Sequence, residues 1–166
     1  MPNWCNNVVT INSDDPEQIK RIEAAVNQGK LFEEFMPFPN GEWDYGWCVE
    51  NWGTKWDARV IDYFRDGDNS ISITFETAWG PPLTLYSYLY ESDEGWEIDA
   101  YYNEPGMCFA GTWYNGSDDL YEYAELSADE IDEELPEELN EMYAIAQYKR
   151  DWEEENEDED EDEEEN

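Results

Sequence analysis

The segment SISITFETAW, residues 70–79, decides the fold class of this chain. Residues 71, 73, 75, 77 and 79, which are mostly apolar, share one face, and the polar residues 72, 74 and 76 share the other; this is the period of a half-buried strand. The four residues DGDN before it (66–69) are typical of a turn, and residues 58–65 can form the other strand of a hairpin. The sequence therefore predicts an antiparallel pair at residues 58–79.

Outward from this hairpin, strands and helices follow one another in a regular order. A strand is predicted at residues 4–12, a helix from the N-cap Asp15 to Gly29, and a second helix at residues 83–92. Further strands are predicted at residues 96–102, 107–114 and 120–125. This pattern predicts an α+β fold, namely a ferredoxin-like antiparallel sheet with two helices on one face, as a domain over residues 1–126.

Residues 31–57 do not follow a helical or strand period. They are rich in Trp and Phe and are interrupted by Pro and Gly. We expect a long loop wrapped over the core here, with a short strand at residues 47–51.

The last third of the chain has a different character. Ser127 and Glu130 form a capping-box pattern, and an acidic helical extension is predicted for residues 127–150. Residues 151–166 are almost all acidic and are predicted to be a disordered tail.

The charge of the chain restricts its partners. It has 45 acidic and 8 basic side chains, and its net charge is −37. Residues 1–116 hold 20 acidic and 6 basic side chains, residues 117–150 hold 12 and 2, and residues 151–166 hold 13 and none. Direct binding to nucleic acid or to an anionic membrane is therefore not expected, because both depend on Lys and Arg. A basic partner protein is expected instead.

Sequence features that are missing restrict the reactions this protein can catalyse and the compartment in which it works. No apolar run approaches the length of a spanning helix and no secretory leader is visible, so we expect a cytoplasmic protein. The chain has no His, and its three Cys (Cys5, Cys48 and Cys108) lack the spacing of a zinc site. We expect reduced thiols, no metal, no cofactor and no enzymatic activity.

Several short blocks resemble one family of proteins. These are MPNWCNN (1–7), ENWGTKWD (50–57), TAWGPP (77–82) and EPG (104–106) followed by FAG (109–111). They are similar to a group of small phage- and plasmid-encoded proteins with a ferredoxin-like domain of largely unassigned role. The resemblance covers about residues 1–116, implies that fold and a viral or mobile-element origin, and brings no catalytic residues.

The acidic extension contains the first candidate site. Pro136 divides this stretch, but if residues 129–141 are helical, their carboxylates span about 20 Å and approach the charge density of duplex DNA. The eight predicted partner-binding residues are Asp129, Glu130, Asp132, Glu133, Glu134, Glu137, Glu138 and Glu141. The alternative is a solvated surface that only keeps the chain soluble or reflects an acid-rich proteome.

The Trp-rich segment contains the second candidate, a pocket for a small ligand or peptide. Indole rings can stack on a planar ligand, and amide or ammonium groups can orient it. Its predicted lining residues are Asn51, Trp52, Lys55, Trp56 and Trp79. The alternative is that these Trp residues cover the core, and that Lys55 stacks on an indole or pairs with Asp57 or Glu50.

Together these observations favour a non-enzymatic phage protein that imitates the charge of DNA. It would inhibit a basic nucleic-acid-binding or defence protein, such as a nuclease, in the host cytoplasm. The alternative function is a binding module that uses the Trp-rich segment.

Overall fold

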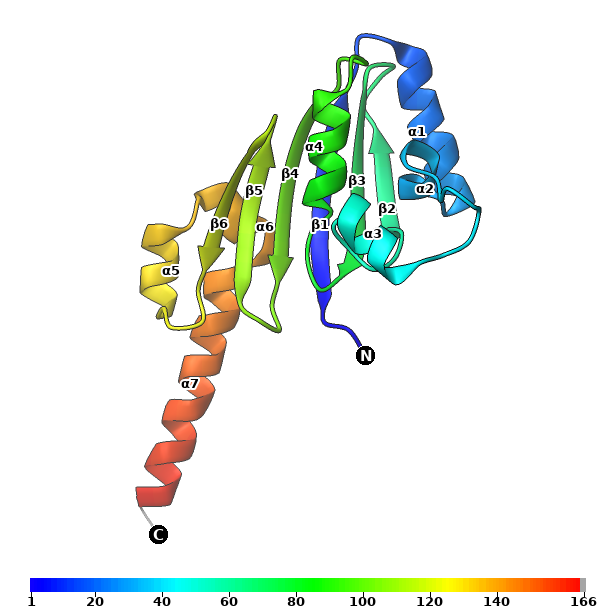
Figure 1. Cartoon of the computed structure of the whole chain (residues 1–166). Coiled ribbons are helices and arrows are strands. Elements are labelled where there is room, and N and C mark those ends of the chain that lie inside the picture. Colours follow the sequence, from blue (N-terminus) through cyan, green and yellow to red (C-terminus); the bar gives the residue numbers. More distant parts are fainter. Residues whose placement is uncertain (165–166) are drawn as a thin grey trace. The chain divides into compact units, whose positions relative to one another are not determined.

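The computed structural model describes residues 1–164 (Figure 1). The chain divides into two compact units, Met1–Leu120 and Tyr121–Asn166. The predicted domain boundary after residue 126 lies slightly further along the chain.

The described residues form a six-stranded antiparallel sheet in the order β2-β3-β1-β4-β5-β6. The central strand β1 pairs with β3 on one side and with β4 on the other. The strands are β1 (Trp4–Asn12), β2 (Arg59–Arg65), β3 (Ser70–Ala78), β4 (Glu97–Glu104), β5 (Phe109–Tyr114) and β6 (Ser117–Glu122). The α+β class is therefore confirmed.

The register explains which strand residues are buried. Val9 of β1 lies opposite Ile73 of β3 and Ala100 of β4, and all three are almost fully buried. Because successive side chains point to opposite faces, the predicted inward positions from Ile71 to Thr77 face the core. Trp79, which was predicted on the same face, lies beyond the end of β3 and is exposed, because its φ of 72° breaks the alternation. β2 pairs with β3 in antiparallel register, from Arg59 opposite Glu76 to Arg65 opposite Ile71, which confirms the predicted hairpin.

Helices of the first unit supply the other side of this core. They are α1 (Pro16–Gln28), α2 (Leu31–Phe35), α3 (Tyr45–Asn51) and α4 (Leu83–Glu91). Ile22 of α1, Phe32 of α2 and Leu85 of α4 belong to one apolar cluster with Val9 and Ile73. As predicted, α1 begins after Asp15 and ends at Gly29, whose φ is 68°.

The predicted loop at residues 31–57 is wrong in part, because it contains α2 and α3. The strand expected at residues 47–51 is the helix α3, which Asp44 caps by accepting a 2.7 Å hydrogen bond from the Trp47 N–H. Asp57 caps α2 by accepting hydrogen bonds from the N–H groups of Phe32 and Glu33. These helices are too short for periodicity to reveal, and the second cap comes from a distant residue.

The second unit consists mainly of helices: α5 (Ala128–Glu134), α6 (Glu137–Tyr143) and α7 (Ile145–Glu164). The predicted disorder of the tail is therefore wrong over residues 151–164, which form most of α7. Residues 165–166 lie outside the described residues. Glu has a high helix propensity and this segment contains no Pro or Gly, so it can extend a helix that begins earlier.

Candidate functional site

The three helices of the second unit pack against one another, with α5 in contact with both α6 and α7. Ile131, Leu139 and Ile145 each contribute a buried side chain. The predicted capping box forms at the start of α5, where the Ser127 hydroxyl accepts a hydrogen bond from the Glu130 N–H and the Glu130 carboxylate accepts one from the Ser127 N–H. The acidic extension is thus an organised helical unit.

Arg150 links α7 to α5. Its Nη2 atom lies 2.7 Å from Asp132 Oδ2 and 3.4 Å from Asp129 Oδ1. The hydrogen bond from Arg150, assisted by one from Asn140, lowers the pKa of Asp132. A second contact joins α7 to α5: Glu153 Oε1 accepts a hydrogen bond from the Ala128 N–H. These contacts fix where the neighbouring carboxylates lie.

All eight predicted partner-binding carboxylates are exposed, but they differ in what they contact. Asp129, Glu130 and Asp132 already have partners within the unit. With the described residues, the following carboxylates form no ion pair: Glu133, Glu134, Glu137 and Glu141. These four are the members of the predicted set that are available to a partner.

The rigid rod of charge considered for residues 129–141 does not form, because the stretch is divided at Pro136. Leu135 has an extended backbone (φ −86°, ψ 146°), and Pro136 separates α5 from α6. A residue before proline is disfavoured in the helical region, and Leu135 is also buried, which holds the break in place. The carboxylates of this segment are therefore displayed on two short helices.

The continuous acidic helix lies instead in α7, where the sequence predicts a disordered tail and no site. Twelve of the fourteen residues at 151–164 are Asp or Glu. Asp151, Glu154, Glu155 and Glu157 are exposed. The high helix propensity of Glu, together with Arg150 directly before this stretch, was the signal that could have revealed it.

The second candidate site is not assembled as predicted. Trp52 is only 1% exposed and belongs to the core, where its Nε1–H donates a hydrogen bond to the Met36 carbonyl. Asn51 donates to the carbonyl of Trp47, one turn earlier in the same helix. The structure therefore uses both side chains to hold the irregular segment together, and Trp52 does not line a pocket.

Lys55 and Trp56 belong to a different, cation–aromatic cluster with Trp4 and Arg59. The Trp4 and Trp56 ring centroids lie 6.1 Å apart. Lys55 Nζ lies 4.3 Å from the Trp56 centroid, and the Arg59 guanidinium carbon lies 4.7 Å from the Trp4 centroid. The predicted alternative that Lys55 stacks on an indole is thus observed. The cluster brings two basic side chains together on an acidic protein.

Trp79 has an unusual backbone conformation. Its φ is 72°, in the left-handed region that bulky residues avoid, and its side chain is 54% exposed. The Trp79 N–H donates a 2.9 Å hydrogen bond to the Asn3 carbonyl, which holds this conformation. The exposed indole of Trp79 is therefore presented by a backbone conformation that costs free energy.

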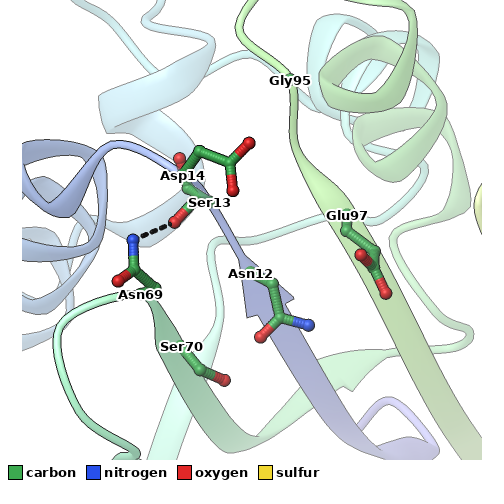
Figure 2. Close-up of a pocket in the computed structure, with 7 residues that line it drawn as sticks. All are labelled: Asn12, Ser13, Asp14, Asn69, Ser70, Gly95 and Glu97. Atoms are coloured by element: carbon green, nitrogen blue, oxygen red, sulfur yellow. Dashed lines mark hydrogen bonds between the residues drawn. The ribbon is translucent and has the colours of Figure 1, made fainter.

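A polar hollow of about 210 Å³ lies where β1, β3 and β4 meet the adjoining loops. Figure 2 shows its lining residues: Asn12, Ser13, Asp14, Asn69, Ser70, Gly95 and Glu97. Asn69 Nδ2 donates a 2.7 Å hydrogen bond to the Ser13 carbonyl. The carboxylates of Asp14 and Glu97 lie on opposite borders and do not converge on one point (Figure 2).

The buried thiol of Cys5 lies in the first unit near Glu104. Burial, with a smaller contribution from the negative charge of Glu104, raises the pKa of Cys5 far above its ordinary value. A thiol that stays protonated is a weak nucleophile. Within the part of the chain that the structure describes, Cys, Asp and Glu residues form no group of three or more that could hold a metal ion.

Over residues 1–164, no helix has the length and apolar character that a membrane span requires.

Comparisons with known proteins yield one similar structure. No protein-family model matches the chain, and no curated protein matches it. The crystal structure of a protein api92 from Yersinia pseudotuberculosis, of the family DUF1281, is similar at 26% sequence identity with a TM-score of 0.36. The similar region covers 48% of this chain and 30% of that chain.

Proposed function

We propose that this chain is a non-enzymatic phage protein that inhibits a basic nucleic-acid-binding or defence protein of its host cell. It would do so in the host cytoplasm by presenting carboxylates in place of DNA phosphates. The observation that carries this proposal is the acidic helix α7, with the exposed carboxylates of α5 and α6 in the same unit.

The charge spacing of α7 supports the comparison with DNA. The twelve carboxylates at residues 151–164 occupy about 21 Å of helix at about 1.5 Å per residue. This is one charge per roughly 1.8 Å, close to the value of about 1.7 Å for duplex DNA. A basic cleft that accepts a duplex would therefore meet a similar charge density.

The energetic cost of this charge also supports a role in binding. Like charges one turn apart destabilise a helix, and negative charges near its C-terminal end oppose the helix dipole. A basic partner would remove both penalties when it binds. Solubility alone requires much less charge than −37.

The first unit is best described as a ferredoxin-like domain. The strand order β2-β3-β1-β4 and the helical connections before β2 and β4 support this arrangement. α1 and α4 contribute to one apolar cluster with β1 and β3, which supports two helices on one face. With the sequence blocks that resemble phage- and plasmid-encoded proteins, this domain supports a mobile-element origin.

A second candidate function is a binding module in the first unit. The observation that favours it is the exposed Trp79, with its positive φ, in the same unit as the cation–aromatic cluster of Trp4, Lys55, Trp56 and Arg59. Trp79→Ala would then abolish binding, whereas neutralised carboxylates in α7 would have no effect.

The proposed function is tested by affinity capture with matched charge variants. The full-length protein is immobilised, exposed to a nuclease-treated bacterial lysate, and eluted with duplex DNA. One variant carries Glu154→Gln, Glu155→Gln and Glu157→Gln. The control carries Glu42→Gln, Glu50→Gln and Asp66→Asn, which removes three exposed charges from the first unit.

We expect the wild type and the control to retain DNA-binding proteins that duplex DNA elutes, and the α7 variant to lose them. If the α7 variant and the control retain the same proteins equally well, the proposal is wrong.

A further inference from the structure

Two large aromatic side chains are exposed on α7, one helical turn apart. Tyr148 is 72% exposed and Trp152 is 56% exposed. Residues at i and i+4 lie on the same face of a helix, so the two rings form one stripe. Ile145 and Ala146, at the start of α7, are buried instead. The stripe therefore lies outside the apolar contacts that hold this unit together.

The surroundings of the stripe are charged. Asp151 and Glu155 lie three residues after Tyr148 and Trp152 and are exposed. Lys149 Nζ lies 4.6 Å from the Trp152 centroid, so a cation already contacts one face of this ring. α7 thus presents an aromatic stripe bordered by carboxylates.

We propose that Tyr148 and Trp152 anchor α7 in an apolar groove that is bordered by Lys and Arg side chains on the basic partner. This inference rests on the proposed function and names the feature that the partner must have. Charge complementarity supports it, because carboxylates border the stripe on the same helix.

The two kinds of contact have different effects on binding. Carboxylates accelerate association and make it sensitive to salt, whereas buried Trp and Tyr side chains provide much of the affinity in many interfaces. An amphipathic helix in a groove uses anchors at i and i+4, which is the spacing of Tyr148 and Trp152. A partner without an apolar groove would bind the carboxylates alone, and weakly at physiological salt.

The test uses two synthetic helical peptides of equal positive charge as probes. One is an amphipathic Lys/Leu peptide, and in the other every Leu is replaced by Gln. Isothermal titration calorimetry measures the affinity of the full-length protein for each peptide at 150 mM salt. The variants are Tyr148→Ala/Trp152→Ala and, as a control, Tyr45→Ala/Tyr88→Ala, which removes two exposed aromatic residues from the first unit.

We expect the wild type and the control to bind the Leu peptide at least about tenfold more tightly than the Gln peptide. In Tyr148→Ala/Trp152→Ala this preference should fall to about one, while the affinity for the Gln peptide is retained. Ala is a good helix former, and an unchanged circular dichroism spectrum would verify that α7 is intact.

An equal affinity of the wild type for both peptides, or a preference that persists in Tyr148→Ala/Trp152→Ala, would overturn the inference. The α7 charge variant separates this result from failure of the proposed function. If Glu154→Gln, Glu155→Gln and Glu157→Gln leave both affinities unchanged, the charge-based proposal fails, whatever the preference for Leu.

Discussion

The Tyr102 hydroxyl donates a 2.6 Å hydrogen bond to Asp118 Oδ1, joining β4 to β6 across β5. Gly111 of β5 lies directly opposite Tyr102 in the register. A Cβ atom at position 111 would be only 2.3 Å from the Tyr102 hydroxyl and 2.6 Å from the Asp119 carbonyl. The absence of a side chain at Gly111 therefore allows the tyrosine to cross the strand.

Gly111→Ala should destabilise the protein by about 2 kcal/mol or more, because neither the ring nor the backbone can move away easily. Urea denaturation provides the measurement. Gly80→Ala is the matched control, since a Cβ there meets no atom within 4 Å, and it should change stability by less than about 0.5 kcal/mol. Equal stability of the two variants would contradict this account of Gly111.

Local sequence patterns predict the strands of the sheet better than its connections. Alternation from Ile71 to Thr77 predicted β3 and its buried face correctly, because the period of a strand is visible within a few residues, whereas Trp79 was wrongly placed on that face. The strand predicted at residues 120–125 is displaced to Ser117–Glu122. Asn115 and Gly116 both have positive φ, and as a two-residue turn they lead directly into β6.

Features that depend on distant residues were not predictable from local patterns. The cap that Asp57 provides for α2 comes from 24 and 25 residues away. Trp52 is a core residue, yet an irregular segment has no period to show which of its Trp residues face inward. The acidity of the tail predicted disorder, but α7 continues to Glu164, and Arg150 and Glu153 of this helix contact α5.

Stability should decrease at alkaline pH because of Cys5. Burial and Glu104 raise the pKa of this thiol in the folded protein, whereas it is about 8.5 in an unfolded chain. Above that pH the unfolded state loses the proton that the folded state keeps, so folding becomes less favourable as pH rises. The loss attributable to Cys5 between pH 8 and pH 10 should be about 2 kcal/mol.

Urea denaturation of the wild type and of Cys5→Ala at both pH values measures this contribution. Cys5→Ala should be less stable at pH 8 but should lose less stability on going to pH 10. The same loss in both proteins would show that Cys5 does not cause the pH dependence. Tyr102, whose pKa is also raised by burial and by the hydrogen bond to Asp118, adds to the loss of stability in both proteins.

The three thiols should differ in reactivity. Cys5 and Cys48 are buried, and burial raises the pKa of both, whereas Cys108 is half-buried in a turn with a φ of 56°. A thiol reagent such as dithionitrobenzoate should therefore modify about one thiol per native chain rapidly and all three after denaturation. Rapid modification of Cys5, identified by peptide mass spectrometry, would contradict the observed burial.

The positive φ of Trp79 predicts an unusual order of stabilities. Trp79→Gly and Trp79→Ala both remove the ring, but only glycine adopts a φ of 72° without steric cost. Trp79→Gly should therefore be more stable than Trp79→Ala by about 1 kcal/mol in thermal or urea denaturation. If the strain is negligible, only the greater flexibility of glycine in the unfolded chain matters, and Trp79→Ala would be the more stable variant. That order would contradict the account of Trp79.

Competition between this protein and duplex DNA for a captured partner tests the proposed mimicry most directly. Fluorescence anisotropy of a labelled 30-base-pair duplex, bound to that partner, is followed as full-length protein is added. Complete release of the duplex is expected, at higher concentrations for the variant with Glu154→Gln, Glu155→Gln and Glu157→Gln than for the wild type. A ternary complex in which the partner retains the duplex would contradict the proposal.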